Sequence, residues 1–103
     1  MNESDLSGQI VVSKCGRDSG RNLIVIGFFQ EDIVLVSDGR LRKAEKPKKK
    51  KMKHLFFTGH YADEIRALLL SGQTVTNGQI KNALSKVKEV IDENNSRLLD
   101  YNC

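Results

Sequence analysis

Lysine is the residue type whose number and spacing most clearly indicate chemistry in this 103-residue chain. The segment EKPKKKKMKHL, residues 45–55, contains the only proline together with Lys46, Lys48, Lys49, Lys50, Lys51 and Lys53. Nine of the 17 lysine and arginine residues lie between Arg40 and Lys53. A row of ammonium groups attracts polyanions, of which nucleic acid is the commonest. The run therefore predicts phosphate contacts; the alternatives are an edge strand protected by charge and a targeting tag.

The other reactive side chains form no recognisable catalytic or metal-binding pattern. His54 and His60 have no ligand spacing relative to Cys15 or Cys103. The sequence contains no glycine-rich phosphate loop, no nucleophile elbow and no paired carboxylates in a known arrangement. We therefore expect no enzyme and no metal, cofactor or small-molecule site, and we assign His54 to the basic surface.

Short strands in the first half of the chain must position the basic residues. Apolar, β-branched and aromatic residues predict strands over 9–13, 22–29, 33–36, 40–44 and 51–57. Asp38-Gly39, between two such runs, is typical of a type I′ hairpin turn. This many short strands in about 50 residues favour a small, strongly bent barrel. Because side chains alternate along a strand, only some lysines of the run can face one partner, and Pro47 suits an edge or a strand start.

The second half changes to helical spacing. Apolar residues predict a helix over 61–70 that ends at Ser71-Gly72. Thr76-Asn77-Gly78-Gln79 has the form of a capping box and begins a longer helix expected over 77–98. One ring of each pair, Phe28-Phe29 and Phe56-Phe57, should face away from the barrel interior. Those rings could stack on unpaired bases, but we favour their being covered by the helices, which need an apolar surface.

The segment GQIVVSKCGRDSGRNLIVIGFFQEDIVLV resembles the KOW motif, in which a basic turn joins two hydrophobic strands. With SDGRLRKAEKPKKKKMKHLFFTG after it, the pattern is similar to KOW-type large-subunit ribosomal proteins of eukaryotes and archaea (the fourteen-e, six-e and twenty-seven-e families) and to small bacterial KOW-containing RNA-binding proteins. The resemblance implies an SH3-like five-stranded barrel over residues 6–58. Two helices over 59–103 would form an extension packed on it, in a fold that is mainly β with C-terminal α.

The resemblance also implies which residues contact RNA. The glycine of the motif corresponds to Gly20, where a glycine permits a positive φ and a close approach of the backbone to a phosphate. Its flanking cations correspond to Lys14, Arg17 and Arg21. Ser19 departs from the lysine that many KOW sequences have at the tip of the turn. With the basic segment that follows, the candidate RNA-binding residues are Lys14, Arg17, Gly20, Arg21, Arg40, Arg42, Lys43, Lys46, Lys48, Lys49, Lys50, Lys51, Lys53 and His54.

Two functions from different classes follow from this reading. The first is an RNA-binding protein that is ribosome-associated, recognises ribosomal RNA by shape and charge, and acts in translation or ribosome assembly, with possible ribosomal-protein partners for the C-terminal helices. The second is a protein-interaction module of the NusG-KOW type in transcription or translation. Two distant cysteines and an acidic, polar N-terminus favour a cytoplasmic ribonucleoprotein component without a secretory signal or membrane contact.

Overall fold

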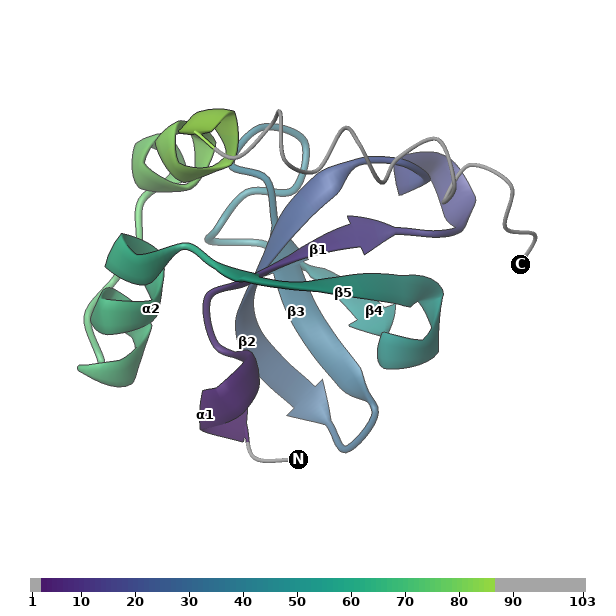
Figure 1. Ribbon diagram of the computed structural model, residues 1–103, viewed down its shortest axis with the longest axis horizontal. Coiled ribbons are helices and arrows are strands. Elements are labelled where there is room, and N and C mark those ends of the chain that lie inside the picture. The colour runs from purple at the N-terminus through teal and green to yellow at the C-terminus, as the bar shows by residue number, and fades with distance from the viewer. Residues whose placement is uncertain (1–2, 87–103) are drawn as a thin grey trace.

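The computed structural model describes residues 3–86 of the chain (Figure 1). One antiparallel sheet dominates it, with the strand order β4-β3-β2-β1-β5. The strands are β1 (Gln9–Ser13), β2 (Asn22–Gln30), β3 (Ile33–Ser37), β4 (Lys48–Lys51) and β5 (Leu55–Tyr61). The domain is mainly β and is followed by helices, as the sequence predicted.

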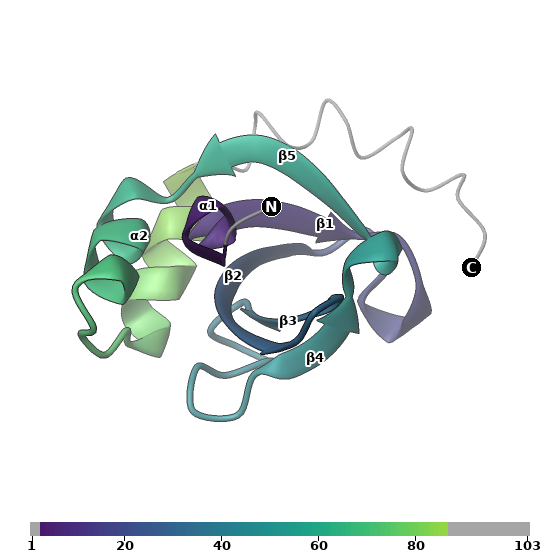
Figure 2. The same cartoon turned by 90° about the horizontal axis from the view of Figure 1, so that it is seen from below.

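The sheet is strongly curved, and β2 accounts for much of the curvature. The pairing of β2 with β3 shifts between Val25 and Gly27 and again between Phe28 and Gln30, so Ile26 and Phe29 are extra residues on β2. Such bulges bend a strand and increase its twist. Figure 2 shows the strands curling around an interior.

The curled sheet nevertheless remains open. β4 and β5 are its two edges, and the chain passes from one to the other through a single 3-10 turn, η2 (Met52–His54). The closed five-stranded barrel expected from the sequence is therefore not confirmed. What the structure has is an open, bent five-stranded sheet.

Two strand predictions were wrong in detail. Residues 40–44 do not form a strand but belong to the loop between β3 and β4, because Asp38 and Ser37 bind the backbone of this segment locally. The strand expected over 51–57 is divided, so the lysine run itself forms β4 and a separate β5 begins at Leu55. Pro47 directly precedes β4, which is an edge strand, in agreement with the expectation from its missing N–H.

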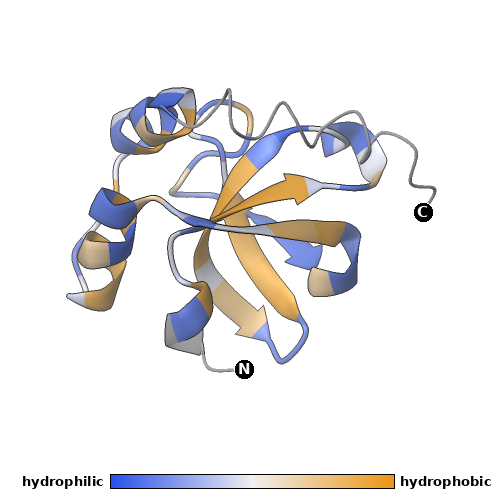
Figure 3. Ribbon diagram, viewed as in Figure 1, coloured by the Kyte–Doolittle hydropathy of each residue, from blue (hydrophilic) through white to orange (hydrophobic). Residues whose placement is uncertain are grey.

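Apolar side chains are buried on both faces of the sheet. The inner cluster fills the curl and consists of Leu6, Val11, Leu23, Val25, Val34, Val36 and Leu55. The outer cluster joins the other face to the helices and consists of Ile10, Val12, Ile24, Ala62, Ile65, Val75, Ile80 and Ala83. Alternation along β1 sends Val11 inward and its two neighbours outward, which explains why the strand is buried along its whole length and apolar at its three central residues (Figure 3).

The four phenylalanines divide between these surfaces. Phe28 and Phe57 pack against the inner cluster, and Phe56 packs against the outer cluster beneath the helices. Helical cover, the outcome favoured from the sequence, is therefore confirmed for Phe56. Phe29 differs, because 49% of its surface is exposed.

The helix expected over 61–70 ends where the sequence predicted but begins at Asp63, and a short helix at the N-terminal end of the described residues was not predicted. A short helix, α1 (Glu3–Leu6), precedes the sheet, and α2 (Asp63–Leu70) follows it. After α2, Gln73 N–H donates to Leu68 O (2.8 Å) and Gly72 N–H donates to Leu69 O (3.1 Å), which is a Schellman motif. No helix in the described part of the chain is long and apolar enough to cross a membrane.

A further helix covers residues 77–86, and the remainder of the expected span to 98 lies outside the described residues. Its capping box is confirmed in both directions. Gln79 N–H donates to Thr76 Oγ1 (3.2 Å), and the Gln79 side-chain oxygen accepts from Thr76 N–H (2.8 Å). The helix start is thus set by four consecutive residues of the sequence.

Candidate nucleic-acid interface

The basic turn between β1 and β2 is held by two glycines in left-handed conformations. The turn contains the 3-10 segment η1 (Gly16–Asp18), and Gly16 and Gly20 have φ of 78° and 82°. Gly20 N–H donates to Ser13 O (2.8 Å), and Arg21 N–H donates to Asp18 O (2.8 Å). The positive φ expected at Gly20 is confirmed. These bonds close the turn on itself and leave Arg17 and Arg21 exposed.

An ion pair joins this turn to the loop between β3 and β4. The Asp18 carboxylate is buried and accepts from Arg42 Nη2 at 3.1 Å and from Arg42 Nε at 3.3 Å. Across the same gap, Arg21 lies 3.9 Å from Asp38. The two basic segments predicted from the sequence are therefore brought together. The role of Asp18 was missed, although a single acid within a basic turn could have indicated an internal partner.

The loop between β3 and β4 is organised by its first acidic residue. Asp38 Oδ1 accepts from the backbone N–H of Arg40 (2.8 Å) and of Arg42 (2.9 Å). A type I′ turn needs positive φ at both central residues, whereas only Gly39 has one here. The predicted Asp-Gly hairpin is therefore wrong, because the side chain of Asp38 binds the backbone that a hairpin would have paired.

The same loop is docked on the start of the helix at 77–86. Asn77 Oδ1 accepts from Ala44 N–H (2.8 Å), and Asn77 Nδ2 donates to both carboxylate oxygens of Glu45 (3.0 and 2.9 Å). A backbone hydrogen bond, followed by the bonds from Asn77 and the nearby charge of Lys43, lowers the pKa of Glu45. The acid inside the lysine run is thereby occupied with holding the loop.

Gly39 makes this docking possible, and it provides a test. A Cβ at Gly39 would lie 2.5 Å from the backbone oxygen of Asn77, whereas a Cβ at Gly72, with a similar φ, meets nothing within 4 Å. We expect Gly39→Ala to lower the free energy of unfolding by at least about 2 kcal/mol more than Gly72→Ala, which incurs only the left-handed strain. Urea denaturation of the two variants measures the difference, and equal losses would contradict the docked loop.

The lysines of β4 lie on both faces of an edge strand. Lys48 and Lys50 pair with Val36 and Val34, and Lys49 and Lys51 pair with Leu35 and Ile33. Alternation therefore places Lys48 and Lys50 on the side of the inner cluster and the other two on the outer side. Only a subset can share one face, as the sequence indicated.

Lys50 differs from its neighbours because it is buried. It is 9% exposed, and its ammonium donates to Cys15 O at 2.9 Å. Burial lowers the pKa of Lys50, and the nearby Asp18 carboxylate opposes that effect. Lys50 therefore has a structural role, because it links β4 to the basic turn. We remove it from the candidate RNA-binding residues.

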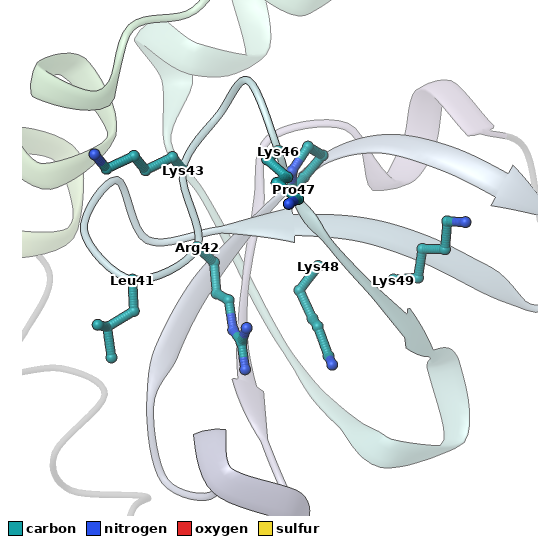
Figure 4. Close-up of a pocket in the computed structure, with 7 residues that line it drawn as sticks. All are labelled: Leu41, Arg42, Lys43, Lys46, Pro47, Lys48 and Lys49. Carbon is teal, nitrogen blue, oxygen red and sulfur yellow. The ribbon is translucent and has the colours of Figure 1, made fainter.

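An open groove lies between the β3–β4 loop and β4 (Figure 4). It has a volume of about 550 Å³ and is lined by Leu41, Arg42, Lys43, Lys46, Pro47, Lys48 and Lys49. In Figure 4 the side chains of Leu41, Arg42 and Lys48 extend in the same direction, whereas that of Lys49 points away. We call this the basic groove; it combines cations with two apolar side chains.

Most of the predicted cations around the basic groove are exposed. Exposed side chains belong to Arg17, Arg21, Arg40, Lys43, Lys46, Lys48, Lys49, Lys51 and Lys53, whereas Lys14, Gly20, Arg42 and His54 are half-buried. Among the described residues, Arg21 pairs with Asp38 and Arg42 pairs with Asp18. Partial desolvation and the charges of Lys53, Lys50, Lys51 and Lys14 lower the pKa of His54. The four neighbouring cations thus disfavour the protonated form of His54.

A scan against protein-family models and a search of curated proteins found no match to the chain. The KOW resemblance therefore stays an expectation from the sequence. Within residues 3–86, no group of three or more histidine, cysteine, aspartate or glutamate residues could hold a metal ion. Within the described residues Cys15 is not a free thiol, which differs from the reduced cysteines on which the cytoplasmic expectation rested.

Proposed function

We propose that this protein binds RNA, with ribosomal RNA as its partner, through the basic turn, the basic groove and the exposed lysines of β4. One observation carries the proposal. The acids within the basic region are engaged internally, Asp18 by Arg42, Asp38 by the loop backbone and Glu45 by Asn77. The exposed lysines of β4 have no such anionic partner among the described residues.

The arrangement of charge favours binding by shape and charge rather than by base sequence. Ammonium groups on flexible stems contact phosphates without reading base edges. The turn and loop that carry them are fixed by internal bonds, so their outline is preorganised. The KOW resemblance, with an SH3-like ancestry for the curled sheet, and a cytoplasmic role in translation or ribosome assembly belong to this proposal.

Salt dependence tests the proposal directly. Neutralising phosphates releases counterions, so the logarithm of the binding constant falls linearly with the logarithm of salt concentration. With about five phosphate contacts we expect a slope of roughly −3 to −5, measured by fluorescence anisotropy on a ribosomal RNA fragment. Co-sedimentation with ribosomal subunits should likewise be lost between low and moderate salt.

The protein-interaction alternative has the opposite signature. An association with a purified protein that is insensitive to salt, together with no binding to ribosomal RNA, would contradict the proposal. It would favour the module of the NusG-KOW type.

A further inference from the structure

We propose that Phe29 and Lys49 form a stacking site for an unpaired base of single-stranded RNA. The inference rests on the proposed RNA-binding function and deepens it. Phe29 is the extra residue of the second bulge in β2, between Phe28, which pairs with Val34, and Gln30, which pairs with Ile33. A bulge redirects the side chain of the residue that it inserts.

The ring of Phe29 lies beyond the cover that the helices provide. Phe56, on the same side of the sheet, packs against the helical cluster, whereas 49% of Phe29 is exposed. Gly27, two residues earlier on β2, adds no side chain beside it. An exposed aromatic ring on a rigid sheet is unfavourably solvated and gains no packing energy from the core. A base stacked on the ring would remove that unfavourable contact with water.

A cation already lies against this ring. The ammonium of Lys49 is 3.9 Å from the centroid of Phe29, across the outer side of β4. A base stacks on an aromatic face, and its own phosphate is within reach of a cation that borders that face. When a base occupies the ring, we expect Lys49 to transfer from the ring to that phosphate.

The surrounding charges orient the RNA strand. Glu31 and Asp32, in the turn after β2, are exposed and repel phosphates at the Lys51 end of β4, where Asp32 O accepts from Met52 N–H (2.9 Å). Lys49, which pairs with Leu35 farther along β4 from that turn, attracts them. A strand running along β4 therefore places its bases toward Phe29. Duplex RNA keeps its bases stacked in pairs and does not present their faces to a protein ring.

The test compares Phe29→Leu with Phe29→Tyr on two probes, a single-stranded RNA 12-mer and a duplex of the same length. Leucine keeps an apolar side chain but removes the π-face, whereas tyrosine keeps it. We expect Phe29→Leu to weaken single-strand binding about tenfold, with duplex affinity and both salt slopes unchanged. Phe29→Tyr should bind as the original protein does. Leu70→Ala controls for loss of an exposed apolar residue, because Leu70 is 52% exposed on α2.

The other possible results of this experiment lead to different conclusions about the stacking site and about RNA binding. Equal weakening of single-strand and duplex binding by Phe29→Leu would overturn the stacking site, because the ring would then act only by holding Lys49. Unchanged affinities with normal salt slopes would also overturn it and would leave the proposed RNA-binding function standing. Absence of binding to either probe by the original protein would contradict both.

Discussion

Replacing Lys48 and Lys51 together by glutamate is expected to weaken RNA binding at least about 30-fold while the domain remains folded. Both side chains are exposed on the edge strand. Each exposed phosphate contact contributes about 1 kcal/mol, and reversal of the charge adds repulsion, so two contacts correspond to about that loss. Fluorescence anisotropy at one fixed salt concentration measures the affinity, and urea denaturation verifies the fold.

The matched control for this variant changes the same amount of charge elsewhere. Lys81 and Lys86 are exposed on the helix at 77–86, so Lys81→Glu with Lys86→Glu alters the net charge equally. Retention of affinity by this control would show that position decides binding. An equal loss in both double variants would mean that net charge attracts the RNA and that β4 is not the contact surface.

Lys50 is excluded from the first experiment for a structural reason. Glutamate at all of positions 48–51 would also replace this buried residue. Lys50 is buried and donates to Cys15 O, close to the carboxylate of Asp18. A glutamate there would bury a second acid beside Asp18, and loss of binding would then report unfolding rather than loss of a contact.

Replacing Asp18 by asparagine is expected to lower the free energy of unfolding by about 2–3 kcal/mol. The substitution keeps the shape of the side chain but removes the charge that neutralises Arg42 and faces Lys50. Removing the acid of a buried ion pair leaves the remaining cation without a neutralising charge. The expected loss of unfolding free energy is at the lower end of the range for broken buried ion pairs, because 29% of the Arg42 side chain remains exposed.

A double-mutant cycle with Arg42→Gln distinguishes loss of the Asp18–Arg42 ion pair from other destabilising effects of each substitution. If Asp18 acts through Arg42, the double variant should be more stable than the sum of the two single losses predicts, by about 1 kcal/mol or more. Chemical denaturation of the four proteins provides the cycle. A single loss below about 0.5 kcal/mol for Asp18→Asn, or strictly additive losses, would contradict the ion pair as the link between turn and loop.

Along residues 37–57, tertiary contacts override part of what local sequence signals predict. Lysine density and the position of Pro47 predicted a basic edge strand, and β4 is one. The hairpin at Asp38-Gly39 failed because the side chain of Asp38 competed successfully for its own backbone. Local propensity does not rank a hairpin against such a capped loop, since the choice depends on Asn77 and Asp18, which are distant in the sequence.

By itself, the sequence determined the strand and helix segments with strong periodicity, the capping box at Thr76, the left-handed glycine at Gly20 and the concentration of positive charge. These features depend on neighbouring residues or on residues one helical turn apart. The tertiary structure alone decided that the sheet is open and which acids are neutralised. It also decided that Lys50 is buried while Phe29 is exposed. Burial and ion pairing are set by residues far apart in the chain, so the same lysine run yields both a structural ammonium and an exposed row of cations.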